Sequence, residues 1–223
     1  MSKLPNLKDL DLSFLKKGQT PAQKAAAEPD SELEELKKKM QVQKMQLELM
    51  YMIIERYKKF IEDGESKSIS DLRTLVRPMD SVITEVKIGI EDQFHPYVYD
   101  SNFLLATQRA MDLVFSWKKV KLPVSFWMGF EDMVHLKAAD DIDRAIFLCS
   151  LFRALGSDSA KVVIGKDRAA WTFFTFGEKD YVVNIGDRTM SAYPNGGDGI
   201  KLFMRTALYS FNDKDYSDLS EGQ

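Results

Sequence analysis

The side chains with the greatest chemical potential gather in one short stretch, Asp140-Asp141-Ile142-Asp143, which opens an apolar segment ending at Gly156. Three carboxylates so close together suggest a hard cation, because Ca²⁺ and Mg²⁺ prefer oxygen ligands. The stretch lacks the glycine turn and the distal glutamate of an EF-hand loop, however. Carboxylates also suit the positive end of a helix dipole. We therefore expect a helix start here, and neither a metal nor a cofactor.

Other candidates for catalysis are few. Cys149 is the single cysteine, and His95 and His135 are the two histidines. Cys149 falls within the apolar segment, where a thiol without a neighbouring cation has a raised pKa and is inert. We expect Cys149 to be a small core residue and both histidines to be surface or capping residues. The glycine-rich stretch 195–199 lacks the Gly-Lys-Ser/Thr ending of a phosphate loop, so we expect a loop over a groove.

The element that must position the aspartates is a predicted helix within residues 138–156. Asp140 is a suitable N-cap, and Gly156 is a suitable stop. Apolar residues cover nearly the whole circumference between them. A helix that is apolar all round is buried, so we expect the domain to be packed around this one.

Beyond Gly156 the apolar period changes to two, which predicts consecutive strands joined by tight turns. The predicted strands are 161–165, 170–176, 180–185 and 189–193, followed by a short helix near 198–204 and a strand near 206–212. Upstream, helices are predicted from residue 70 or 71 to 78 and over 101–117, whereas 80–90 is ambiguous between helix and strand. The fold class is therefore α+β, with the buried helix packed on an antiparallel sheet.

A long amphipathic helix is predicted over residues 30–63, outside that domain. Its apolar positions alternate spacings of three and four, which is typical of a coiled coil. The seam consists of Leu33, Leu36, Met40, Gln43, Leu47, Met50, Ile54, Tyr57 and Ile61. Leu47, Met50 and Ile54 are the candidates for contact with a partner helix or a second copy. A second stripe consists of Val42, Met45, Leu49, Met52, Ile53 and Phe60. Packing of the whole helix within its own chain is the alternative.

Residues 1–29 are expected to be a disordered tail, in which residues 7–15 form an apolar and acidic island that could be a docking motif. A net charge of −3 argues against nucleic acid as the main partner. The single cysteine fits a reducing compartment. The sequence shows neither a signal peptide nor an apolar run long enough to span a membrane. We therefore expect a soluble cytoplasmic protein.

Trp127, Glu131 and the stretch 139–156, followed by Ala-Trp at 170–171, together resemble a known family. They are similar to the transglutaminase-like, papain-like superfamily, and the closest pattern is that of the prokaryotic transglutaminase-like cysteine proteinases. The resemblance implies a transglutaminase-like domain over about 68–216. It places the family's nucleophilic cysteine at Asp141, its histidine at Ala169 and its aspartate at Asn184.

All three triad positions therefore carry residues that cannot serve as thiolate, base or orienting acid. The resemblance then implies a catalytically inactive, pseudoenzyme-like protein that acts as an interaction or scaffold module. Its former groove, with Trp171 as a candidate contact, could still hold an extended peptide. The alternative is an enzyme with a rearranged site, either a cysteine hydrolase or a hydrolase that uses Asp141.

Overall fold

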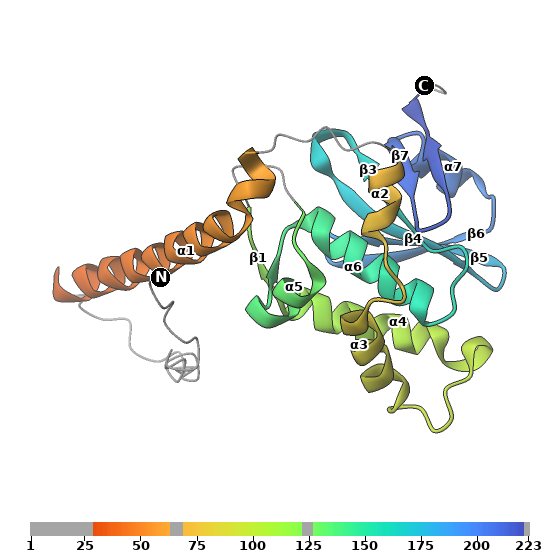
Figure 1. Ribbon diagram of the computed structural model, residues 1–223, viewed down its shortest axis with the longest axis horizontal. Coiled ribbons are helices and arrows are strands. Elements are labelled where there is room, and N and C mark those ends of the chain that lie inside the picture. Colours follow the sequence, from red (N-terminus) through yellow and green to blue (C-terminus); the bar gives the residue numbers. More distant parts are fainter. Residues whose placement is uncertain (1–28, 63–68, 122–126, 221–223) are drawn as a thin grey trace. The chain divides into compact units, whose positions relative to one another are not determined.

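The computed structural model of the protein describes residues 29–62, 69–121 and 127–220 (Figure 1). The chain divides into two compact units, residues 1–49 and 50–223, and the division falls inside the long helix α1 (Pro29–Glu62). This helix confirms the predicted long N-terminal helix. The predicted tail up to residue 28 and the docking motif at 7–15 lie outside the described residues.

The second unit is organised around helix α6 (Asp141–Ala154), as predicted. Asp140 is its N-cap, and the Asp140 carboxylate accepts a hydrogen bond from the Asp143 amide at 2.8 Å. The helix ends at Ala154 with Leu155 as its C-cap, and Gly156 follows with a φ of 111°, a conformation that glycine adopts readily. Every residue from 142 to 152 is buried, because the sequence supplies apolar side chains on all sides.

A six-stranded antiparallel sheet follows α6, in the order β6-β5-β4-β3-β7-β8. The first four strands along the chain form the predicted meander, since each pairs with the next. The strands are β3 (Lys161–Gly165), β4 (Ala170–Phe176), β5 (Lys179–Asn184), β6 (Thr189–Pro194), β7 (Ala207–Phe211) and β8 (Tyr216–Asp218). The last of these was not predicted. Helix α7 (Asp198–Met204) lies between β6 and β7 in sequence, where a short helix was expected.

The remaining elements are helical apart from a two-stranded parallel ladder. The stretch 80–90, ambiguous in sequence, is helix α3, begun by an Asp80 side chain that accepts the Val82 amide hydrogen bond. The helices are α2 (Ile69–Leu75), α3 (Ser81–Glu91), α4 (Tyr99–Ser116) and α5 (Phe130–Leu136), and a single 3-10 turn η3 (Lys166–Arg168) precedes β4. The ladder pairs β1 (Lys118–Lys119) with β2 (Ala138–Ala139).

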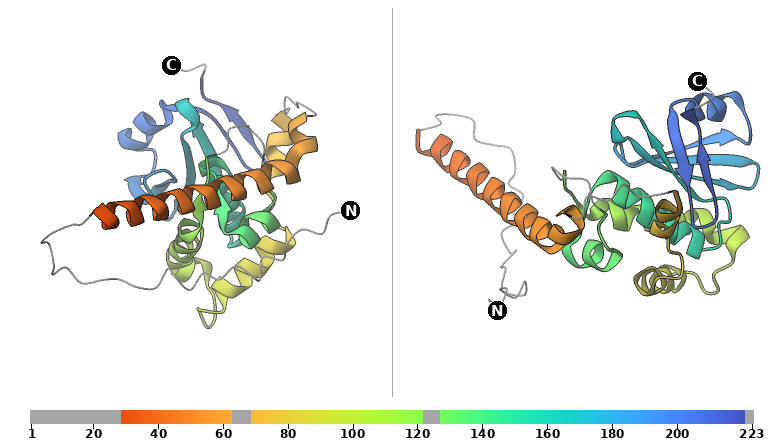
Figure 2. Two further views of the ribbon diagram at one scale, coloured as in Figure 1. Left: turned by 90° about the vertical axis from the view of Figure 1, so that its left-hand side faces the viewer. Right: turned by 45° about the horizontal axis from the view of Figure 1, so that its top comes forward.

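The two faces of the sheet have different covers (Figure 2). On one face lies α6, whose Ala145 carbonyl accepts a hydrogen bond from Thr172 and whose Phe152 ring packs 5.3 Å from Phe174. On the other face, α7 covers a cluster that includes Phe173, with Trp171 packed against it.

From the sequence, a helix packed on the sheet is expected to place Phe152 and Ile146 against the sheet near Trp171 and Phe173. The structure corrects this expectation. Successive residues of a strand point to opposite faces of the sheet, so Trp171 and Phe173 point away from α6. Phe152 instead meets the intervening ring, Phe174, and the Phe103 ring of α4 at 6.3 Å. The α+β fold with the buried helix on the sheet is confirmed, and only the face assigned to these aromatic residues was wrong.

Candidate functional site

The first candidate site is a cleft of about 290 Å³ at the N-terminus of α6. It is lined by residues from three places in the sequence: the end of β1 and the residues after it, the start of α6, and the turn η3. The lining residues are Lys119, Val120, Lys121, Asp140, Asp141, Ile142 and Arg168. The cleft therefore combines carboxylates at a helix start with three basic side chains.

Asp140 and Asp141, which line the cleft, both form ion pairs with basic side chains. Lys119 Nζ lies 2.6 Å from Asp141 Oδ2, and Arg168 Nη2 lies 3.5 Å from Asp140 Oδ2. Burial raises the pKa of the Asp140 carboxyl, whereas its hydrogen bond to the Asp143 amide and the Arg168 charge oppose that rise. These contacts join the end of β1 and the turn η3 to the start of the helix.

In the same turn of the helix, the side chains of Asp143 and Arg144 are buried, and only some of their polar atoms have hydrogen-bond partners. Asp143 Oδ1 accepts the Met128 amide at 3.2 Å, while Oδ2 has no hydrogen-bond partner among the described residues. Burial, reinforced by the charge of Asp140, raises the pKa of the Asp143 carboxyl well above its usual range. Arg144 donates to the Trp117 carbonyl at 2.7 Å, and its Nε and Nη1 have no partner within the described ranges.

The predicted triad positions do not all meet in the cleft. Asp141 lines it, and Ala169 directly follows Arg168, which also lines it. Asn184, by contrast, pairs with Trp171 across the β4–β5 ladder and therefore shares the α7 face of the sheet. The Asn184 side chain donates to Asp187 Oδ2 at 2.8 Å and accepts the Asp187 amide, which closes the turn after β5.

Trp171 is also placed away from the cleft. Its ring packs edge-on against Phe203 of α7 at 5.3 Å and lies over Gly165, where an added Cβ would stand 2.5 Å from the indole. Glycine at 165 is therefore needed for this close approach. Trp171 thus has a packing role within the domain in addition to the partner contact predicted for it.

Other reactive groups are poorly placed for chemistry. Cys149 is fully buried, and burial raises the pKa of its thiol, as expected of an inert core cysteine. His95 and His135 are both exposed, and neither is among the residues that line the cleft. In the described part of the chain, no group of three or more His, Cys, Asp or Glu side chains could hold a metal ion. Among the described residues, the lining of the cleft is therefore charged and includes neither the thiol nor an imidazole.

The second candidate site is the apolar seam of α1. Its N-terminal half is exposed, with Leu36, Met40 and Leu47 retaining 57%, 63% and 66% of their accessible surface. Near the other end, Tyr57 of the seam and Ile53 of the second stripe are buried, while Met50 and Ile54 of the seam are half-buried. The seam is thus divided, because its last turns pack within the second unit and its first turns are uncovered.

Lysines edge the exposed half of the seam. If Leu33 and Leu36 are heptad positions a and d, the e and g positions between Leu33 and Leu47 are Lys37, Lys39, Lys44 and Gln46, all exposed, and Glu32 is the g position just before Leu33. Residues at e and g lie beside those of a partner helix and decide which partner is accepted. The sequence analysis missed this edge, although the heptad frame alone would have revealed it.

Sequence reasoning also missed the anchor that holds the end of α1. The Tyr57 hydroxyl donates to Asp132 Oδ2 at 2.6 Å and accepts the Gly129 amide at 2.7 Å. Arg56 adds an ion pair to Asp132 Oδ1 at 2.6 Å. No local pattern in the sequence signals this contact, because it joins residues 75 positions apart.

Comparison with known proteins identifies no relative: no protein-family model, curated protein or solved structure matches the chain. The transglutaminase-like assignment therefore stays a prediction. Among the helices of the described residues, none is long and apolar enough to cross a lipid bilayer.

Proposed function

We propose that this protein is a non-catalytic interaction module: a transglutaminase-like domain without a working triad, whose helical arm docks a helix of another protein. The observation that carries the proposal is the exposed, lysine-edged seam of α1. Large apolar side chains in a regular heptad frame gain stability when a second helix covers them.

The charges beside the seam favour a foreign partner over a second copy. In a parallel pair, the g residue of one helix faces the e residue of the next heptad. Glu32 would then face Lys37 with attraction, whereas Lys39 would face Lys44 with repulsion. In an antiparallel pair, e positions face each other, so Lys37 and Lys44 would again meet lysines. Like charges across a pairing interface are destabilising, whereas glutamates at the partner's e and g positions would attract these lysines. The partner is therefore an acidic heptad helix.

Two features of the cleft support the absence of catalysis. Asp141, at the position of the family's nucleophile, is ion-paired with Lys119 instead of being poised beside a base. The sole thiol lies inside the buried helix, about 12 Å along the axis from Asp141. A nucleophile needs an adjacent base within hydrogen-bond reach, and neither group has an imidazole beside it.

The test uses the full chain and a labelled synthetic peptide of about four heptads, with leucine at a and d and glutamate at e and g. Fluorescence anisotropy measures binding to the wild type, to Leu36→Asp/Leu47→Asp and to a matched control, Leu105→Asp/Leu202→Asp. The control changes two equally exposed leucines of α4 and α7. We expect saturable binding that the α1 variant loses and the control keeps.

Two outcomes would overturn the proposal. Absence of peptide binding by the wild type would show that the seam is not a docking surface. Turnover of peptide, ester or amine-acceptor substrates that disappears in Asp141→Ala would show that the cleft is an enzyme site. This second result would favour the alternative of a rearranged hydrolase.

A further inference from the structure

The α7 face of the sheet has a polar end that α7 does not cover. Strand register places five side chains on this face: Phe173 is opposite Lys161, Val163 is opposite Ser210, and Ser210 is opposite Ser217. Val163 and Phe173 belong to the cluster under α7, which fixes the face for the others. Lys161, Phe173, Ser210 and Ser217 therefore lie on one side of adjacent strands β4, β3, β7 and β8.

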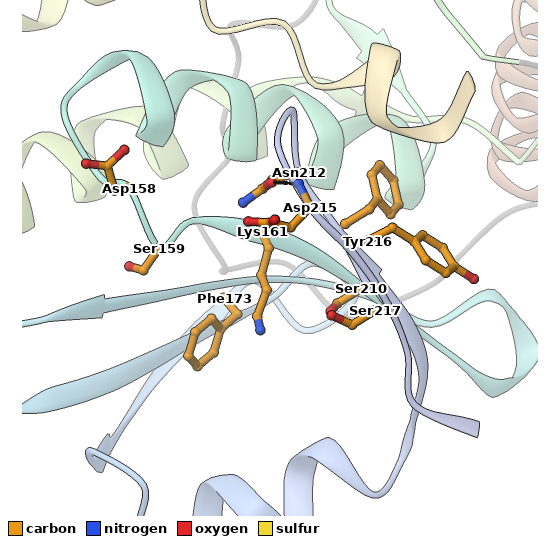
Figure 3. A pocket seen from close by; sticks show the side chains of 10 residues that line it. Asp158, Ser159, Lys161, Phe173, Ser210, Asn212, Asp215, Tyr216 and Ser217 are labelled. Carbon is orange, nitrogen blue, oxygen red and sulfur yellow. Dashed lines mark hydrogen bonds between the residues drawn. The ribbon is translucent and has the colours of Figure 1, made fainter. Parts of the chain in front are cut away.

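These side chains line a cavity of about 370 Å³, here called the Lys161 pocket (Figure 3). The other lining residues come from the turn after α6 and from the β7–β8 hairpin: Asp158, Ser159, Phe211, Asn212, Asp215 and Tyr216. Figure 3 shows the Lys161 side chain extending from β3 with its amine beside the Phe173 ring. The ammonium nitrogen lies 4.9 Å from the ring centroid.

Some polar groups of the pocket are occupied by structural contacts. Ser159 exchanges hydrogen bonds with the Thr175 backbone, and Asn212 bonds the Ala160 carbonyl and the Lys214 amide. Asp158 is ion-paired with Arg153 at 3.2 Å and with Lys214 at 3.1 Å. These residues shape the hairpin and the pocket wall.

The donors that remain in the pocket include the side chains of Lys161, Ser210 and Ser217. Within the described ranges, no carboxylate lies within salt-bridge distance of Lys161 Nζ, and the hydroxyls of Ser210 and Ser217 have no hydrogen-bond partner. Partial burial lowers the pKa of Lys161, and the more distant charges of Asp180 and Asp215 oppose that change. A half-buried ammonium has lost hydrogen bonds to water, so an anionic ligand that accepts hydrogen bonds from it stabilises it.

We propose that the Lys161 pocket binds a small organic carboxylate, with Lys161, Ser210 and Ser217 donating to the carboxylate and Phe173 contacting an apolar group. Among the described residues that line it, the pocket offers one unpaired ammonium, Lys161, and the nearby Asp215 carboxylate opposes added negative charge, so a monoanion matches the pocket better than a dianion such as a phosphate monoester. The ring of Phe173 favours a planar or aromatic apolar part. This site is independent of the α1 seam and of the cleft at α6.

The test titrates the ¹⁵N-labelled full chain with benzoate and follows backbone amide shifts by NMR. Benzamide is the neutral isostere and phenyl phosphate is the dianion. We expect saturable shifts centred on Lys161, Phe173 and Ser210 with benzoate. Benzamide should bind about ten- to a hundredfold more weakly, because it lacks the charge-assisted hydrogen bonds. Phenyl phosphate should bind more weakly than benzoate.

Variants locate the site. Lys161→Met should lose benzoate binding, whereas Lys179→Met, which removes an exposed lysine at the start of β5, should retain it. The ligand comparison on the wild type remains decisive even if Lys161→Met fails to fold. Equal affinity for benzoate and benzamide, shifts that do not saturate, or shifts centred elsewhere would each overturn the proposal.

Discussion

The hydroxyl of Tyr57 and the carboxylate of Asp132 lie 2.6 Å apart and join the end of α1 to α5. The same hydroxyl accepts the Gly129 amide, and burial raises the pKa of Tyr57, so the hydroxyl stays protonated as a donor. The two ends of α1 therefore differ in their contacts. Its last turns belong to the domain, and its first turns offer the seam.

Tyr57→Phe should therefore destabilise the second unit and loosen the last turns of α1. Phenylalanine keeps the ring but removes the hydrogen bonds that Tyr57 makes with Asp132 Oδ2 and with the Gly129 amide, at a cost of about 1–3 kcal/mol, while the Arg56 ion pair to Asp132 Oδ1 remains. Denaturant unfolding measures the loss, and hydrogen exchange of residues 50–62 locates it. Tyr51→Phe, at an exposed position of the same helix, is the control and should change stability by less than about 0.5 kcal/mol. Equal stability of the two variants would contradict the anchor.

Phe152→Ala tests the central position of α6. Phe152 is fully buried between Phe103 and Phe174, so its removal should lower the free energy of unfolding by about 3–5 kcal/mol. Chemical denaturation gives this value directly. Leu105→Ala, on the exposed face of α4, provides the comparison. A loss below about 1 kcal/mol for Phe152→Ala would show that α6 is peripheral.

Asp143 should make stability depend on pH. Its pKa is raised in the folded state, so the folded protein binds this proton more tightly than the unfolded chain does. The contribution is therefore present at low pH and is lost as pH rises from the ordinary carboxyl range through the raised folded pKa. Within that window, the free energy of unfolding falls by up to about 1.4 kcal/mol per pH unit from this group.

Asp143→Asn should remove this dependence, because the amide keeps an acceptor for the Met128 N–H and carries no charge. Urea unfolding measured from pH 4 to pH 8 should show a flatter profile for this variant than for the wild type. Asp112→Asn removes the same charge at an exposed site on α4 and should leave the slope unchanged. Parallel profiles for the wild type and Asp143→Asn would refute this assignment.

Cys149 should react only when the protein unfolds. A thiol-reactive probe needs access to a thiolate, and Cys149 is buried with a raised pKa. Mass spectrometry after timed labelling should show no modification of the native chain and complete modification in denaturant. Rapid, stoichiometric labelling of the native protein would instead favour the cysteine-enzyme alternative.

The sequence was sufficient to predict α1 from its heptad repeat, α6 from its continuous apolar character and its end signals, and the four-strand meander from short apolar runs separated by turn residues. It could not assign Trp171 and Phe173 to a face of the sheet, since both faces of β4 are covered and its residues do not alternate between apolar and polar. The Tyr57–Asp132 contact and the Lys161 pocket bring together residues that are far apart in the sequence, so a local sequence pattern could not predict them. The β-branched residues of the 80–90 stretch are common in strands, so the sequence did not decide between helix and strand. The structure shows the helix α3, capped by the Asp80 side chain.

The candidate cleft was predicted only in part for a similar reason. Asp140 and Asp141 were identified from their place at the helix start. Lys119 and Arg168 complete the cleft from distant segments, and lysine or arginine at an isolated position carries no signal of its partner. Asn184 was assigned from a resemblance in strand order, whereas the register of β4 and β5 places it on the α7 face.

The most direct test of the docking account exchanges the charge beside the seam. Lys37→Glu/Lys39→Glu/Lys44→Glu changes no apolar contact, and its binding to the glutamate-edged peptide is compared with binding to a lysine-edged peptide of the same core. Three exposed pairs at roughly 0.5 kcal/mol each, changed from attraction to repulsion, amount to about 3 kcal/mol. We predict that the wild type prefers the acidic peptide and the variant the basic one, each by about tenfold or more. An unchanged preference, or equal binding of both peptides by both proteins, would contradict the claim that this seam selects an acidic partner helix.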